Sequence, residues 1–414
     1  MHSMDESPLS RFASSLSPSS TRFASDHGVV REFPMYTLPV ETVLQLKKLL
    51  PHEEAWELES PLKPLQAFRE EMGRAIFVSH QWLSAKHPDP HSEQLRILQA
   101  TLGNLLSGAA RVSLQPLVEL ARGRGGPVPV VLPKSRWTGD SERGLKQRVV
   151  RGICQKFAVA MDRLTVNAMR RLDMFGMTSS LVLKALEEVG RMSHRARVMR
   201  SSSSSEAARA HRHLAISSIP SYVARSFFFM ILCPPLRHQE QRQMLNYSTW
   251  ATRGWCRLER LARELARRED GYILIAESPY HIFLEWQPNA QAKAPGSGQF
   301  SVEADRARVG KLLLKMVWSK LLYYLERGEF NSYRFQLNLQ RVGCLEGLEM
   351  QPIEGLVPNF STDIDPEAEP ERFVVARFLH DNGFIGIRHR DTAGWTPICY
   401  AAVNGNCFLP SSSC

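Results

Sequence analysis

Three runs of consecutive apolar residues predict buried β-strands. They lie at Ala75–Val78, Phe227–Leu232 and Gly271–Ala276. Runs without a polar residue at every second position are typical of strands that are covered on both faces in a parallel sheet. Polar or proline-containing segments bound each run, so we expect three strands of one sheet.

Apolar residues at helical spacing predict helices around these strands. One helix carries Leu95, Leu98 and Leu102, and we expect Asp89 to cap it with Pro90 at its first position. Further helices are predicted over about 38–50, 218–223, 255–268 and 302–328. Strands that alternate with helices favour an α/β fold, an open and mostly parallel sheet with helices on both faces.

The pattern towards the end of the chain differs from that of the rest. Residues Asp391–Asn406 follow the ankyrin pattern D-x-x-G-x-T-P-L-H-x-A-A-x-x-G, with Ile398 at the Leu position and Cys399 before Tyr400 where His is typical. The segment Val374–Gly383 resembles the second helix of a preceding repeat. Thr396 and Pro397 would open a helix whose small alanines pack on a neighbour. We therefore expect a truncated α-helical ankyrin segment that binds protein partners.

Charge changes this picture in one place. The chain of 414 residues has 52 Lys and Arg against 42 Asp and Glu, a formal net charge of +10. Residues 141–213 hold 15 basic and 6 acidic residues, and the rest is nearly balanced at 37 against 36. The basic residues are scattered and carry no nucleic-acid motif, so we do not expect nucleic acid as a partner, and nucleic-acid binding through 141–213 stands as a third alternative. We interpret 141–213 as an insertion or linker, helical or disordered.

Cysteines and apolar runs bear on the compartment. Seven widely spaced cysteines without a C-x-x-C pair favour a reducing compartment, and no apolar run reaches the roughly 18–20 residues of a membrane span. We therefore expect a cytoplasmic protein with no membrane span. The predicted division is a disordered Ser-rich tail at 1–33, an α/β domain in two parts at 34–140 and 214–335 around the insertion 141–213, a linker at 336–370 and partial ankyrin repeats at 371–414.

Three spaced motifs carry a resemblance. The segments Phe77–Trp82, Ser218–Val223 and Arg253–Glu259 resemble a divergent Toll/interleukin-receptor (TIR)-like domain over about residues 70–290, without the basic insertion. The whole chain is similar to uncharacterised protist proteins that join such a domain to ankyrin repeats. The resemblance implies a flavodoxin-like fold with a five-stranded parallel sheet.

The resemblance also implies candidate site residues. Some members of the family cleave the nicotinamide–ribose bond of NAD, and others are binding adaptors. The catalytic Glu of the enzymatic members falls on Glu259, where a carboxylate could stabilise an oxocarbenium-like transition state. Ligands of such folds bind at the carboxyl edge of the sheet. The candidate ligand-binding residues are Ser79, His80, Gln81, Trp82 and Trp255.

Glu259 and Trp255 also have purely structural explanations. Glu259 can form a surface ion pair with Arg263 one turn later, and Trp255 can anchor the core or a loop. His80, His87 and His91 match no usual ligand spacing, so no metal is expected.

Two functional hypotheses follow. One is an intracellular signalling or scaffold protein whose TIR-like domain mediates self-association or ligand binding, and the other is a glycohydrolase with NAD as its substrate.

Overall fold

The computed structural model divides by its contacts into two compact units. It describes residues 7–16, 32–49, 66–85, 87–110, 112–114, 174–176, 214–267, 271–285 and 293–405. Arg31–Thr252 and Arg268–Ala290 form one unit, which we call the α/β unit. Met1–Val30, Arg253–Arg267 and Gln291–Cys414 form the other, which we call the helical unit.

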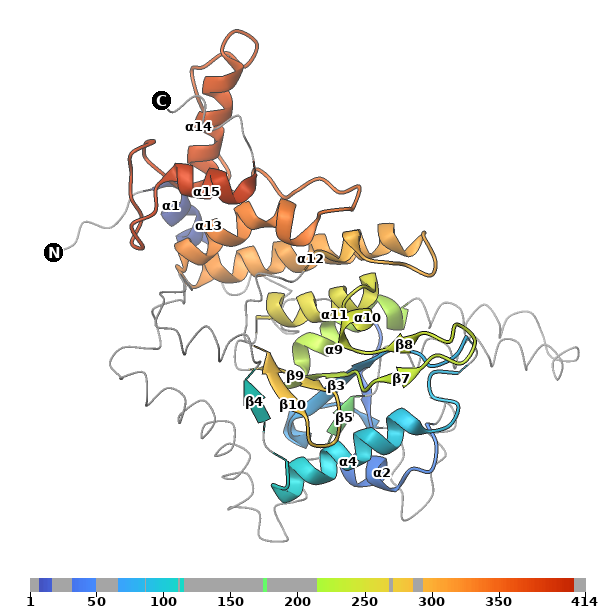
Figure 1. Cartoon of the computed structure of the whole chain (residues 1–414). Coiled ribbons are helices and arrows are strands. Elements are labelled where there is room, and N and C mark those ends of the chain that lie inside the picture. The colour runs from blue at the N-terminus through green and yellow to red at the C-terminus, as the bar shows by residue number, and fades with distance from the viewer. Residues whose placement is uncertain are drawn as a thin grey trace, which may run out of the picture. The chain divides into compact units, whose positions relative to one another are not determined.

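A mixed, mostly parallel sheet forms the centre of the α/β unit (Figure 1). Its strands are β3 (Ala75–His80), β4 (Val112–Leu114), β5 (Met174–Gly176), β6 (Phe228–Leu232), β9 (Tyr272–Ala276) and β10 (Ile282–Glu285). They lie in the order β4-β10-β9-β6-β3-β5, and every neighbouring pair is parallel except β9 and β10. The predicted α/β class with a mostly parallel sheet is confirmed.

The antiparallel pair has a simple local cause. Only residues 277–281 separate β9 from β10. Parallel strands need a crossover of a dozen or more residues, whereas antiparallel strands can be joined by a short turn. The amide of Glu277 donates to the carbonyl of His281 at 3.0 Å and closes this turn.

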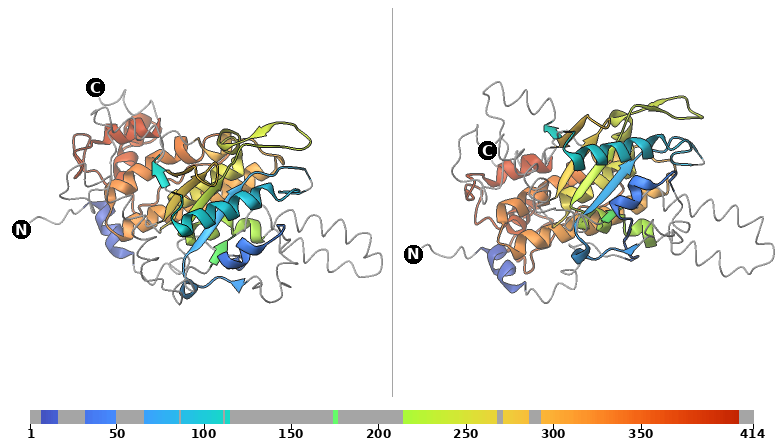
Figure 2. Two further views of the ribbon diagram at one scale, coloured as in Figure 1. Left: turned by 60° about the horizontal axis from the view of Figure 1, so that its bottom comes forward. Right: turned by 90° about the horizontal axis from the view of Figure 1, so that it is seen from below.

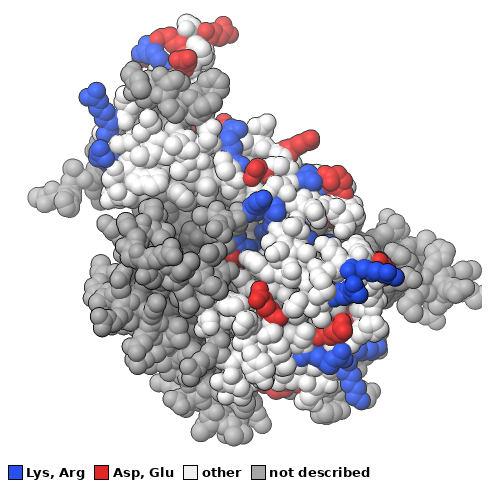
Figure 3. Space-filling model, viewed as in Figure 1, with Lys and Arg blue, Asp and Glu red and all other residues white. Residues whose placement is uncertain are grey.

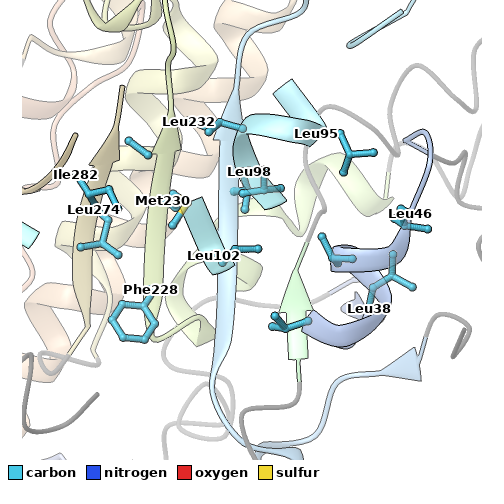
Figure 4. Packing of buried hydrophobic residues seen from close by; sticks show 14 of the residues in the cluster. Leu38, Leu46, Leu95, Leu98, Leu102, Phe228, Met230, Leu232, Leu274 and Ile282 are labelled. Carbon is cyan, nitrogen blue, oxygen red and sulfur yellow. The ribbon is translucent and has the colours of Figure 1, made fainter. Parts of the chain in front are cut away.

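Apolar side chains cover both faces of the central strands. Neighbouring residues on a strand point to opposite faces. One face carries Val78, Met230 and Leu274, which join a continuous buried cluster with Leu98 and Leu102 (Figure 4). Phe77, Phe229 and Ile273 stand in register on the other face and are each 0% exposed. This burial on both faces explains the unbroken apolar runs of the sequence.

Helices lie on both sides of this sheet. Helix α2 (Val40–Gln45) and helix α4 (Glu93–Ser107) cover one face, and the views of Figure 2 bring them forward. The Gln99 side chain ties them by donating to the carbonyls of Val43 and Leu46, both at 2.8 Å. Helices α9 (Ile219–Arg225) and α10 (Tyr247–Trp250) lie on the opposite side in Figure 1.

Short elements complete the described part of this unit. They are the pair β1 (Tyr36–Thr37) and β2 (Gln66–Ala67), the 3₁₀ turn η2 (Glu70–Met72) and the pair β7 (Leu236–Arg237) and β8 (Met244–Leu245). Strand β5 lies inside the predicted basic insertion 141–213 and pairs with β3. The remainder of that insertion lies outside the described residues.

Six α-helices are described in the helical unit. They are α1 (Pro8–Ser15), α11 (Gly254–Leu265), α12 (Asp305–Glu326), α13 (Phe330–Leu339), α14 (Pro370–Asn382) and α15 (Pro397–Asn404), accompanied by the 3₁₀ turn η5 (Pro295–Ser297) and the π turn η6 (Gln340–Cys344). The expected helices over 255–268 and 302–328 correspond to α11 and α12. Gly328, at φ 67°, follows α12 in the left-handed conformation that favours glycine.

Two segments of this unit are more ordered than the sequence indicated. The tail at 1–33 is not disordered throughout, because residues 8–15 form α1 and its Leu9 is 0% exposed against α14 and α12. An apolar side chain this deeply buried stabilises order. The segment 336–370, expected to be a linker, includes the end of α13 and the buried Leu345, Leu356 and Val357.

None of the helices in the described ranges combines the length and the apolar character that crossing a membrane requires.

Candidate functional site

Strand alternation separates two of the predicted ligand-binding residues. Ser79 and His80 are the last residues of β3, so their side chains leave opposite faces of the sheet. His80 stands in register with Leu232 on the face that α4 covers. Ser79 stands in register with Ile231 on the other face, and it is only 1% exposed. Neither of these side chains extends from the sheet edge into solvent.

Ser79 serves as a hydrogen-bond acceptor inside the unit. Its Oγ accepts from Nε1 of Trp250 at 2.9 Å, and both side chains are buried. Trp250 stacks on Tyr247 with ring centroids 6.0 Å apart and lies 6.4 Å from the ring of Phe229. A buried indole N–H needs such a partner, since leaving it unpaired costs about 1–3 kcal/mol.

A capping box holds Trp250 in this place. The Asn246 side chain accepts from the Thr249 amide at 3.2 Å, and Thr249 Oγ1 accepts from the Asn246 amide at 2.9 Å. This reciprocal pair satisfies the first free amides of α10 and fixes its direction. The Asn246–Trp250 segment therefore forms a preformed support under the end of β3.

Gln81 joins that support to α4. Its Oε1 accepts from Thr249 Oγ1 at 2.7 Å, and its carbonyl accepts from Nε2 of Gln94 at 2.7 Å. Gln94 is buried in the first turn of α4 and also approaches the Pro88 carbonyl at 3.4 Å. Trp82 follows in the loop and is partly exposed. The end of β3 is thus bonded on both sides.

His80 lies beside the acidic start of α4. Burial lowers the pKa of His80, while its bond to the Gln81 carbonyl and the nearby Asp89 and Gln94 oppose that shift. The Asp89 carboxylate is 1% exposed and accepts from the amides of Glu93 and Leu95, both at 2.8 Å.

Asp89 therefore caps α4 as the sequence predicted, but the position of Pro90 was predicted wrongly. The helix begins at Glu93, and Ser92 precedes it at φ 56°. Pro90 lies in the turn before the helix, and the Asp89 side chain reaches over that turn.

One buried carboxylate of this unit was not singled out from the sequence. Glu285, at the end of β10, is 3% exposed and accepts from the Tyr247 hydroxyl at 3.3 Å. Its partner on β9 is Ile273, so it lies on the same face as Phe229 and Trp250. The signal in the sequence was an acidic residue that ends an apolar run.

The two remaining predicted site residues belong to the helical unit. Glu259, on α11, is 6% exposed, so the alternative of a surface ion pair with Arg263 was wrong in placing it on the surface. Arg260 and Arg263 are buried on the same helix, and Nη2 of Arg260 bonds to the Glu264 carboxylate one turn later at 2.7 Å.

Trp255 is a structural anchor in this unit. Its Nε1 donates to the Asp305 carboxylate at 3.0 Å, at the start of α12. The neighbouring Gly254 packs so closely on Phe300 that an added Cβ would lie 2.1 Å from the ring. Nη1 of Arg257 donates to the Ala294 carbonyl at 3.1 Å, and burial lowers the pKa of Arg257. The motif Arg253–Glu259 thus fixes the segment 294–305 to α11.

The ankyrin-like turn is held by another buried carboxylate. Oδ1 of Asp391 accepts from the amides of Ala393 and Trp395, both at 2.9 Å, and Oδ2 accepts from the Tyr400 hydroxyl at 2.6 Å. The side chain of Asp391 is 0% exposed, and Arg334 approaches it to 4.0 Å. Burial and the Asp391 carboxylate raise the pKa of Tyr400, so the phenol stays protonated.

Two further observations limit the chemistry of these sites. Nowhere in the described part of the chain do three His, Cys, Asp or Glu side chains converge as a metal site would require. Cys233 and Cys344 are free and buried, and burial raises the pKa of the Cys344 thiol to about 12. These two cysteines are therefore poor nucleophiles at neutral pH.

The chain was compared with family models, curated proteins and solved structures. No family model, no curated protein and no solved structure matches it.

Proposed function

We propose that this protein is an interaction scaffold, with a TIR-like α/β unit and an ankyrin-like helical unit that binds protein partners. The proposal rests on one observation, namely that the side chains at the end of β3 are buried or engaged in hydrogen bonds within the unit. Ser79 and Gln81 are bonded to Trp250, Thr249 and Gln94, and His80 is buried. Side chains engaged in this way support a rigid module better than they serve a reaction.

The strand order supports the TIR-like part of the proposal. Without the edge strand β4, the order β5-β3-β6-β9-β10 is 2-1-3-4-5 in chain order. That is the order of flavodoxin-like folds. The antiparallel direction of β10 departs from an all-parallel sheet.

The turn between α14 and α15 supports the ankyrin-like part. Gly383 ends α14 at φ 65°, Asp391 organises the turn, and Pro397 opens α15. Ile398, in the first turn of α15, is 44% exposed. An exposed apolar side chain on a preformed turn is a suitable contact for another protein.

Partner capture with matched variants tests the scaffold. The full chain serves as bait for cell extract, beside Ile398→Asp and the control Val374→Asp, whose site on α14 is 43% exposed. We expect proteins held by the wild type to be lost with Ile398→Asp and kept with Val374→Asp. A captured set that is the same for all three baits would contradict the proposed binding surface.

An NAD glycohydrolase is the second candidate, and the burial of Glu259 favours it. A carboxylate that is 6% exposed is costly to bury, and functional sites retain such groups. The test is nicotinamide release from NAD by the full chain, by Glu259→Gln and by Glu264→Gln as a control on the same helix. The scaffold proposal expects no release above the blank. Release that only Glu259→Gln abolishes would establish the enzyme instead.

A further inference from the structure

Two exposed surfaces of opposite charge lie at the two ends of α14. Before and at its start, residues 363–371 form what we call the acidic segment. Its acidic residues are Asp363, Asp365, Glu367, Glu369 and Glu371, all exposed, and the sequence from 342 to 371 has no Lys or Arg. In Figure 3 mostly acidic side chains gather over the upper end of α14. The acidic segment is therefore a strongly negative surface.

Beyond the other end of α14, residues 384–390 form what we call the fingertip. Ile385 is 79% exposed and Ile387 is 47% exposed. Arg388 and Arg390 are exposed beside them, so apolar and positive groups share one short loop. A pair of exposed isoleucines with flanking arginines is typical of a contact surface.

The fingertip has a fixed shape. Phe384 at its base is 4% exposed and packs 5.6 Å from the ring of His389. The amide of His389 donates to the Gly386 carbonyl at 3.1 Å, and Arg390 donates to the Gly394 carbonyl at 2.9 Å. A preformed loop loses little conformational entropy when it binds.

The acidic segment and the fingertip of one chain are held apart. Helix α14 has 13 residues, which corresponds to a length of about 20 Å. Glu369 pairs locally with Arg372, whereas Asp363, Glu367 and Arg388 form no ion pair with any residue in the described ranges. The charges of Asp363, Glu367 and Arg388 are therefore available to another molecule.

We infer that the fingertip of one copy binds the acidic segment of a second copy, head to tail along α14. Each copy carries both halves of the contact, and their charges are complementary. The isoleucines supply apolar burial, and the opposite charges set the orientation of the two copies. Because the two surfaces differ, the contact is heterologous and can continue into longer assemblies. Its small area predicts a weak and reversible association.

This inference rests on the proposed function, because it names one partner of the scaffold. The two can fail separately. Self-association is measured with purified protein alone, whereas the scaffold test concerns foreign partners and the site at Ile398.

Sedimentation velocity of the full chain is the first measurement. At about 0.1 mM protein and low salt we expect a mass average that rises with protein concentration. At about 1 M salt the screening length falls to about 3 Å, and we expect monomer. A monomer at every concentration in low salt would overturn the inference.

The decisive experiment uses two complementary variants, each measured alone and then mixed. One chain carries Ile385→Asp with Arg388→Glu in the fingertip, and the other carries Asp363→Lys with Glu367→Lys in the acidic segment. Each alone should associate at least about tenfold more weakly than the wild type. Mixed together they should form a pair, because one retains an intact acidic segment and the other an intact fingertip.

The pairing of the mixture shows that both variants are folded. Val302→Asp with Lys311→Glu is the matched control, because it makes the same charge change at two exposed positions of the same unit. We expect it to associate like the wild type. Loss of association in this control, or a mixture that stays monomeric, would overturn the inference.

Discussion

The two units of the molecule are stabilised in contrasting ways. In the α/β unit, strands buried on both faces form a continuous apolar cluster, and buried polar contacts such as Ser79 to Trp250 lie at the strand ends. In the helical unit, polar and charged side chains lie inside the helix contacts. Arg334 donates to the Asn382 carbonyl at 2.7 Å, and Asn338 donates to the Asn382 side chain at 2.6 Å.

This difference indicates which substitutions should destabilise each unit. Apolar burial is nonspecific in direction and tolerates small shifts. A buried polar network contributes only when every partner is satisfied, and it is costly when one is lost. We therefore expect the replacement of a single buried polar residue to lower the stability of the helical unit more than that of the α/β unit.

The largest effect is expected from Asp391→Ala. It removes the acceptor for two amides and for the Tyr400 hydroxyl, together with the buried negative charge that Arg334 approaches to 4.0 Å, which should cost about 3–5 kcal/mol. Hydrogen exchange of residues 391–404, followed by mass spectrometry, checks this locally. Asp363→Ala, at an exposed position, is the control. Unchanged protection in Asp391→Ala would show that the turn does not depend on this carboxylate.

A smaller effect is expected from Trp250→Phe. The change removes the bond to Ser79 and part of a buried ring, so the free energy of unfolding of the α/β unit should fall by about 1–3 kcal/mol. Chemical denaturation measures it, with Trp318→Phe on the exposed side of α12 as the control. If the hydrogen bond matters, adding Ser79→Ala should cost less in the Trp250→Phe chain than in the wild type. Full additivity would refute the coupling.

The smallest effect is expected from acid. Because burial lowers the pKa of His80, the folded chain binds fewer protons at this residue than the unfolded chain does. Stability from this group is therefore complete above the unfolded value of about 6.5 and declines as the pH falls below it. Thermal unfolding between pH 7 and pH 5 should show a weaker decline in His80→Gln than in the wild type. The exposed His91→Gln should behave like the wild type.

The sequence allowed the apolar parts of this fold to be predicted. The runs at 75–78, 227–232 and 271–276 correspond to β3, β6 and β9, because strands buried on both faces carry few polar residues. Helix α13 was missed, because the polar Arg334 and Asn338 share its buried face with Tyr333 and Leu337 and obscure the apolar pattern. The fold class could therefore be read, but the polar interior could not.

The candidate site shows the same division. Asp89 as the cap of α4 follows from local spacing, and the structure contains that bond. The bond from Trp250 to Ser79 joins residues 171 positions apart, so no local pattern indicates it. Glu259 was judged by its i,i+4 neighbours, and local spacing does not reveal that it is buried.

The place of Leu9 has a consequence for the order in which the chain folds. Leu9 packs so closely on Gly383 that an added Cβ there would lie 2.4 Å from the Leu9 Cβ. During synthesis from the N-terminus, α1 emerges long before its partner does, and the whole α/β unit is translated in between. The α/β unit can therefore fold while the chain is still growing, whereas α1 waits for α14. Its docking marks a late step of folding.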